Sequence, residues 1–107
     1  MYIKYNEYEL FELFESEPIT PSGKEAGQFI YSKKEDSRGI EIMLSFSVYE
    51  MKCNICLSAG AQVIFEATLE QVEYLHSDGK CLRIHQMKPN QDYLIHFMPS
   101  IFIKIGE

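Results

Sequence analysis

The 107-residue sequence lacks any long apolar run. No stretch approaches the ~20 residues that a membrane-spanning helix needs. The opening residues, MYIKYNEYE, turn acidic at once and contain no apolar core of the kind that secretory signals carry. The sequence therefore predicts a protein that stays in the cytoplasm and does not bind membranes.

Basic residues are also scarce. Ten Lys and Arg stand against 16 Asp and Glu, so the formal net charge is −6. Such a surface repels the phosphates of nucleic acids, so DNA and RNA are not expected partners. A basic protein would instead be attracted, and its encounter with this chain would be accelerated. The same charge would equally serve to keep a small protein soluble.

Recognisable catalytic and metal-binding motifs are missing as well. The chain has no phosphate-binding glycine loop, no H-E-x-x-H and no Ser-His-Asp order. Cys53 and Cys56 have C-x-x-C spacing, but they fall in a strand-like segment, where residues i and i+3 point to opposite faces. Three cysteines without an export signal indicate reduced thiols. We expect no enzyme, no metal and no cofactor.

One histidine could still lie beside a cysteine. A two-residue Asp78-Gly79 turn would place His76 opposite Cys81 in a β-hairpin. A nucleophilic cysteine also needs an orienting acid and an oxyanion hole, and no glycine-rich elbow or helix start follows Cys81. His85 lies four residues further along the strand, ~13 Å away, too far to share a metal ion with Cys81. These side chains are therefore interpreted as ordinary surface residues.

The strongest positive signal is alternation. In IEIMLSFSV, residues 40–48, every second residue is a large hydrophobe, which predicts a strand with one buried face. Strands are expected at Gln28–Lys33, Gly39–Tyr49, Cys53–Ser58, Gln62–Leu69, Val72–Ser77, Cys81–Met87, Tyr93–Met98 and Ile101–Ile105. Their connections are too short for parallel crossovers, so neighbouring strands should be antiparallel.

A short helix is expected before the strands. Asn6 can cap it, Glu7–Ser16 carries a Leu/Phe stripe, and Pro18 ends it. Residues 2–5 could form a short edge strand, and residues 19–27 read as a loop rich in Pro, Gly and Ser. The predicted fold is mainly β, at the margin of α+β. It is one domain spanning residues 1–107, with the helix followed by a seven- to eight-stranded antiparallel meander. This many strands should curl into a sandwich or a half-closed barrel.

Acidic and aromatic residues gather near the N-terminus and form the candidate protein-binding surface. The residues expected to contact a partner are Tyr5, Tyr8, Glu7, Glu9, Glu12 and Glu15. Tyrosine is enriched at binding hot spots, and carboxylates pair with Arg or Lys of a basic partner. The alternative is that the tyrosines pack on the sheet and the glutamates only solvate one face of a helix.

The run YNEYELFELFESEP (residues 5–18), then a loop and an acidic β-meander ending in an alternating Ile/Phe strand, resembles small proteins of Gram-positive bacteria. Some of these are similar to immunity proteins of polymorphic or contact-dependent toxin systems. The resemblance implies a non-catalytic, cytoplasmic bacterial protein that neutralises a basic toxin domain by covering its active site.

Two other functions remain open. One is a small-ligand binder whose strands close around an apolar pocket lined by Phe46, Phe65 and Phe97. The other is a homo-oligomeric structural protein that pairs through the edge strand Ile101–Ile105. Lys104 within that strand opposes such pairing, because charged residues protect exposed edges. A monomer and a homodimer are both compatible with the sequence.

Overall fold

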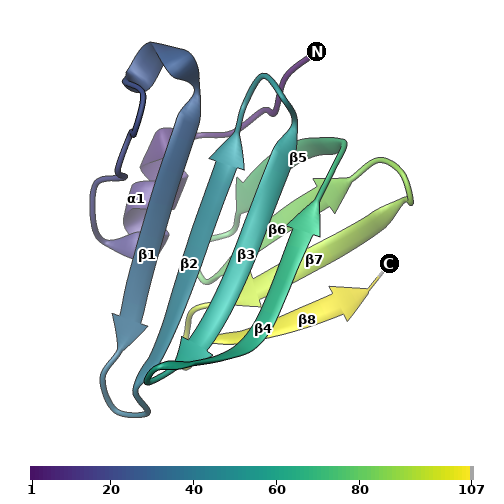
Figure 1. The fold of residues 1–107 in the computed structure, drawn as a ribbon. Coiled ribbons are helices and arrows are strands. Elements are labelled where there is room, and N and C mark those ends of the chain that lie inside the picture. The colour runs from purple at the N-terminus through teal and green to yellow at the C-terminus, as the bar shows by residue number, and fades with distance from the viewer. Residues whose placement is uncertain (107) are drawn as a thin grey trace.

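The computed structural model describes residues 1–106 and shows a short helix followed by two antiparallel four-stranded sheets (Figure 1). The helix is α1 (Glu7–Phe14), and a 3₁₀ turn follows at Lys24–Ala26. The first sheet contains β1 (Gln28–Glu35), β2 (Ile40–Ser47), β3 (Lys52–Ala59) and β4 (Gln62–Leu69). The second contains β5 (Val72–Ser77), β6 (Cys81–Gln86), β7 (Gln91–His96) and β8 (Phe102–Gly106). The predicted mainly β fold is confirmed, as a sandwich-like pair of sheets.

The core lies between the two sheets and is made by their alternating apolar residues. On β2, Ile42 and Leu44 are fully buried, whereas Met43 between them is 42% exposed. The opposing sheet contributes Leu82, Ile84 and Ile95, which are also fully buried. The second sheet lies behind the first, and its strands cross those of the first obliquely (Figure 1). Each strand thus buries the face that its alternation marks as apolar.

The hairpin formed by β5 and β6 differs from the sequence prediction. His76 lies opposite Arg83 instead of Cys81, because the turn is longer than the two residues expected. The Asp78 carboxylate accepts hydrogen bonds from the backbone N–H groups of Lys80 (3.0 Å) and Cys81 (2.9 Å). This local side-chain bonding extends the turn to residues 78–81 and shifts the register by two. For residues 74–77 a shift of two leaves the side chains on their predicted faces, but an irregularity between Val72 and Tyr74 places Val72 opposite Gln86 instead of His85.

The N-terminal segment and α1 cover one side of the sandwich, next to β1 and β5. Residues 2–5 do not form the short edge strand that the sequence allowed. Lys4 makes only an isolated parallel bridge with Tyr74 of β5. The helix ends two residues before Ser16, because Glu15 adopts a left-handed conformation (φ 58°) and donates its N–H to Phe11. On the far side of the sandwich, β4 and β8 are the sheet edges. None of the described helices has the length and apolar character to cross a membrane.

Candidate protein-binding surface

The helix α1 presents three of the predicted binding residues, Glu7, Tyr8 and Glu12, to solvent. Asn6 starts the helix, since its side-chain oxygen accepts hydrogen bonds from the N–H groups of Tyr8 (2.8 Å) and Glu9 (3.3 Å). The buried side of the helix consists of Leu10, Leu13 and Phe14. With that side fixed against the sheets, the opposite side faces outward, and Tyr8 is 80% exposed.

Two further predicted binding residues, Glu9 and Glu15, make contacts within the protein. One carboxylate oxygen of Glu9 accepts a hydrogen bond from the Ser77 N–H (3.1 Å), and the other lies 3.7 Å from His76 Nδ1. Glu15 lies on the surface, 3.1 Å from Lys33 Nζ. Glu9 therefore fastens α1 to β5, and its substitution would disturb the fold as well as any partner contact.

Tyr5, the remaining predicted binding residue, is half-buried. Its ring packs against Phe29 and Phe46 with centroid distances of 5.5 and 5.3 Å. Burial is the main reason that the pKa of the Tyr5 hydroxyl is raised. Tyr5 therefore belongs in part to the core, as the alternative interpretation of the tyrosines expected.

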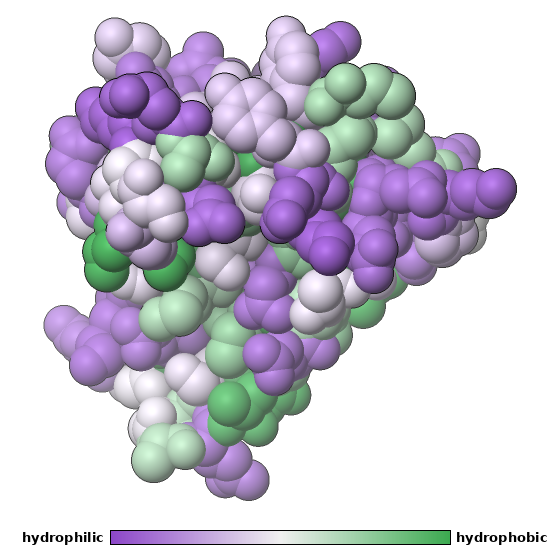
Figure 2. Space-filling model, turned by 45° about the horizontal axis from the view of Figure 1, so that its top comes forward, coloured by the Kyte–Doolittle hydropathy of each residue, from purple (hydrophilic) through white to green (hydrophobic). Residues whose placement is uncertain are grey.

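Two grooves lie beside these residues. The helix groove, of about 330 Å³, is lined by Glu7, Tyr8, Phe11, Glu17, Pro18, Lys24, Phe29 and Tyr31. The amino-terminal groove, of about 450 Å³, is lined by Tyr2, Ile3, Lys4, Tyr5, Lys24, Gly27, Phe29, Val48 and Tyr49. Because Lys24 and Phe29 line both grooves, the two adjoin. Figure 2, which brings the top of Figure 1 forward, shows small apolar and pale patches interspersed with hydrophilic side chains.

A polar cluster on the outer face of the second sheet was not predicted. His85 Nδ1 lies 2.7 Å from an Asp92 carboxylate oxygen, and Arg83 pairs with the other oxygen. The hydrogen bond from His85 is the main cause that lowers the pKa of Asp92, and Arg83 adds to it. Glu73 lies 3.5 Å from His85 Nε2, and the Tyr74 ring stacks on His85 at 5.0 Å. The β5–β6 register places Tyr74 opposite His85, and the β6–β7 register places His85 opposite Asp92, which lies outside the strand predicted to begin at Tyr93.

The cysteines lie as the strand geometry predicts. Cys53 is buried in the core, Cys56 is paired with the exposed Met43 on the outer face, and all three cysteines are free. Burial raises the pKa of Cys53 to about 12, so its thiolate is negligible at neutral pH. Within residues 1–106, no group of three or more His, Cys, Asp or Glu side chains is placed to hold a metal ion.

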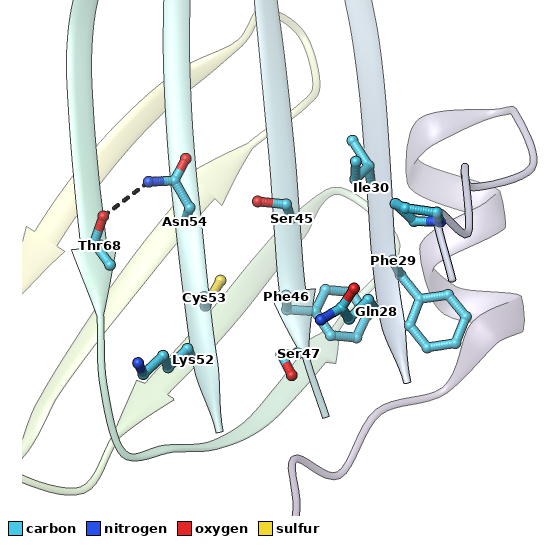
Figure 3. A pocket seen from close by; sticks show the side chains of 11 residues that line it. Gln28, Phe29, Ile30, Ser45, Phe46, Ser47, Lys52, Cys53, Asn54 and Thr68 are labelled. Atoms are coloured by element: carbon cyan, nitrogen blue, oxygen red, sulfur yellow. Dashed lines mark hydrogen bonds between the residues drawn. The ribbon is translucent and has the colours of Figure 1, made fainter. Parts of the chain in front are cut away.

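The three phenylalanines proposed to line a ligand pocket do not share one. Phe97 is buried and packs edge-on against Phe14 at 5.0 Å. Phe46 borders a hollow of about 250 Å³ on the first sheet, and Phe65 borders a different groove of about 510 Å³. Figure 3 shows the hollow from outside the sheet, where Asn54 donates a hydrogen bond to Thr68 (2.9 Å). These rings mainly fill the core, as small sandwiches require.

The far side of the sandwich bears on the oligomer alternative. Between the edges of β4 and β8 lies the groove of about 510 Å³, and its surroundings expose Val63, Ile64, Phe102 and Ile105. Two features oppose pairing of these edges with another chain. Lys104 is exposed on β8, and the pairing of β3 with β4 contains a register irregularity at Leu57–Ser58.

Comparison with known proteins gives a structural match. A scan against protein-family models and a search of curated proteins gave no match. Among solved structures, the chain is similar to a chain of the contact-dependent growth inhibition toxin–immunity protein complex from Klebsiella pneumoniae 342. The TM-score is 0.82 at 24% identity, covering 99% of this chain and 98% of the matched chain. At this identity the likeness establishes a shared fold along the whole chain.

Proposed function

We propose that this protein is an immunity protein: a non-catalytic, cytoplasmic protein that binds a toxin domain and covers its active site. The observation that carries the proposal is the end-to-end match in fold to a chain of a toxin–immunity protein complex. The N-terminal sequence pattern and the acidic β-meander point to the same class of protein.

The charge favours the immunity role over the toxin role. A net charge of −6 suits a protein that approaches a basic cleft, such as that of a toxin acting on nucleic acid. The same charge would hinder a toxin that must itself bind phosphate backbones. We therefore assign this chain to the acidic, neutralising side of such a pair.

The surface around α1 is the proposed contact region. Glu7, Tyr8 and Glu12 are exposed there, and exposed aromatic rings border both grooves. A rigid aromatic ring beside carboxylates suits recognition of arginine and lysine on a partner. Glu9 and Glu15 would contribute less, because each already has a partner within the chain.

The direct test is neutralisation in cells. The candidate toxin domain encoded next to this chain is induced in bacteria with and without co-expression of the protein. We expect growth to be restored only when the protein is present, and the purified pair to form a stable complex on size exclusion.

The negative control is Ile55→Asp, which places an unpaired charge at a fully buried position. This variant should neither fold nor restore growth. Rescue that persists in that variant, or a purified toxin domain that neither binds the protein nor is inhibited by it, would contradict the proposed function.

A further inference from the structure

We propose that the helix groove is a binding site for the guanidinium group of an arginine on the protein partner. This inference rests on the proposed function, because it names the chemical group that the surface around α1 would recognise. It assigns the groove, and not only the helix surface, as the centre of contact.

Two carboxylates converge on this groove from different parts of the chain. Glu7 lies in the first turn of α1, and Glu17 lies in the segment that follows the helix. Both line the groove with Tyr31, and both act electrostatically on the Tyr31 hydroxyl. The tertiary structure therefore brings two negative charges to one groove, and Lys24 is the one basic side chain among the lining residues.

The Tyr31 hydroxyl adds a hydrogen-bond acceptor to the groove. Tyr31 is only 2% exposed, yet its hydroxyl makes no hydrogen bond among residues 1–106. Among residues 1–106, His96 Nε2 is the one side-chain nitrogen or oxygen that is both closed off from water and without a partner. The Tyr31 hydroxyl is therefore not closed off from water, and it is accessible from the groove that Tyr31 lines. Burial, followed by the nearby Tyr5, Glu7 and Glu17, raises its pKa to about 12, so this oxygen stays protonated at neutral pH. Its lone pairs are open to a donor from outside the chain.

The aromatic lining favours arginine over lysine. Tyr8 and Phe11 line the groove and are 80% and 48% exposed, so their rings are accessible to a ligand. A planar guanidinium stacks on such rings and still directs its N–H groups to carboxylates and a hydroxyl. The ammonium of lysine is a strongly hydrated point charge, so it stacks less well on aromatic rings while bonding to carboxylates. A bound anion would be repelled by Glu7 and Glu17.

The first experiment uses N-acetyl-arginine amide as a probe, followed by NMR of the full chain. We expect saturable shifts of the Tyr8, Phe11 and Tyr31 ring signals, with a Kd on the order of millimolar for a ligand of this size. Nα-acetyl-lysine amide, which keeps its ε-ammonium, should bind at least about threefold more weakly. Nα-acetyl-norleucine amide, which has no charge, should leave these signals unchanged.

The matched variants are Glu7→Gln with Glu17→Gln, and, as control, Glu66→Gln with Glu70→Gln. Both pairs remove two exposed carboxylates, but the control pair lies on and after β4, outside the groove. The groove pair should weaken arginine binding about tenfold or more, and the control pair less than about twofold. Tyr31→Phe, which removes only the hydroxyl, should also weaken it. The site would be contradicted if both variant pairs lost arginine affinity equally, or if the arginine probe shifted NMR signals near all exposed carboxylates.

The same variants separate this inference from the proposed function. With the toxin domain as ligand, Glu7→Gln with Glu17→Gln should raise the Kd about tenfold or more while circular dichroism shows an unchanged fold. If that variant binds the toxin domain with the affinity of the wild type, the arginine site is contradicted and the proposed immunity function is not. If the wild-type chain does not bind the toxin domain but binds the arginine probe saturably in the groove, the proposed immunity function is contradicted and the arginine site is not.

Discussion

At the scale of single residues, Glu35 and Arg38 join the two sheets through the backbone of Ile101. The Glu35 carboxylate accepts a hydrogen bond from the Ile101 N–H (2.8 Å), and the Arg38 guanidinium donates to the Ile101 carbonyl (2.8 Å). Arg38 also donates to Glu35 at 2.6 Å. The turn after β1 is thereby fastened to the segment before β8, across a sequence separation that no local pattern reveals.

This contact predicts a pH-dependent stability. The hydrogen bonds from Arg38 and Ile101 lower the pKa of Glu35 from 4.5 to about 2. A lowered folded-state pKa adds stability above pH 4.5, and that stability is lost as the pH falls toward about 2. Glu35→Gln should therefore lower the Tm at pH 7, and the difference from wild type should shrink between pH 4.5 and 2. Thermal unfolding followed by circular dichroism measures both.

Glu66→Gln is the control for this measurement. Glu66 is an exposed carboxyl on β4 that makes no side-chain hydrogen bond with the described residues, so its loss should change the Tm little at any pH. A Glu35→Gln variant with the same Tm as wild type at pH 7 would show that the contact does not stabilise the fold.

At the scale of elements, the helix α1 has two structural roles. It covers the side of the sandwich beside β1 and β5, and it forms one wall of the helix groove. A helix of 8 residues has little stability alone, so it depends on its cap and on the packing of its buried side. The candidate binding surface is therefore only as well ordered as the attachment of this helix.

Asn6→Ala should lower the free energy of unfolding by about 1 kcal/mol, because two N–H groups in the first turn lose their acceptor. Urea unfolding followed by circular dichroism measures this loss. Asn6→Asp keeps a capping oxygen and should retain most of the stability. Equal losses in the two variants would show that the cap is not the cause.

At the scale of the whole molecule, charge should govern the rate of association. The chain carries a net charge of −6, and exposed charges on α1 lie at the proposed contact region. Long-range attraction raises the association rate and is screened by salt, whereas short-range packing chiefly sets the dissociation rate.

The association rate with the toxin domain should therefore fall as NaCl rises from about 0.05 to about 0.5 M, while the dissociation rate changes little. Stopped-flow mixing at several salt concentrations measures the rates. Glu7→Lys with Glu12→Lys should lower the association rate further, and the control is the lysine pair Glu66→Lys with Glu70→Lys, which lies outside the helix groove. An association rate independent of both salt and these substitutions would contradict electrostatic steering.

Much of the secondary structure followed from local patterns. Apolar alternation in β2, together with the turn residues between the other segments, predicted all eight strands, although the bounds of β7 differ by two residues. The two-residue period also placed Cys53 and Cys56 on opposite faces. The start of α1 followed from Asn6 and its end nearly so. The exact register of the β5–β6 hairpin did not follow from the sequence. The Asp-Gly pair predicted a two-residue turn, whereas the hydrogen bonds of the Asp78 side chain stabilise a longer one.

What the sequence by itself determined is the class of the fold, its acidity and the clustering of Glu and Tyr near the N-terminus, whereas the structure showed that Glu7, Tyr8 and Glu12 are exposed. Only the tertiary structure decided that Glu9 is engaged with β5, and that Glu17 and Tyr31 meet Glu7 in one groove. The physical reason is the range of the interactions. A strand's alternation acts between residues two apart, whereas the groove depends on how the helix, the loop and β1 pack together.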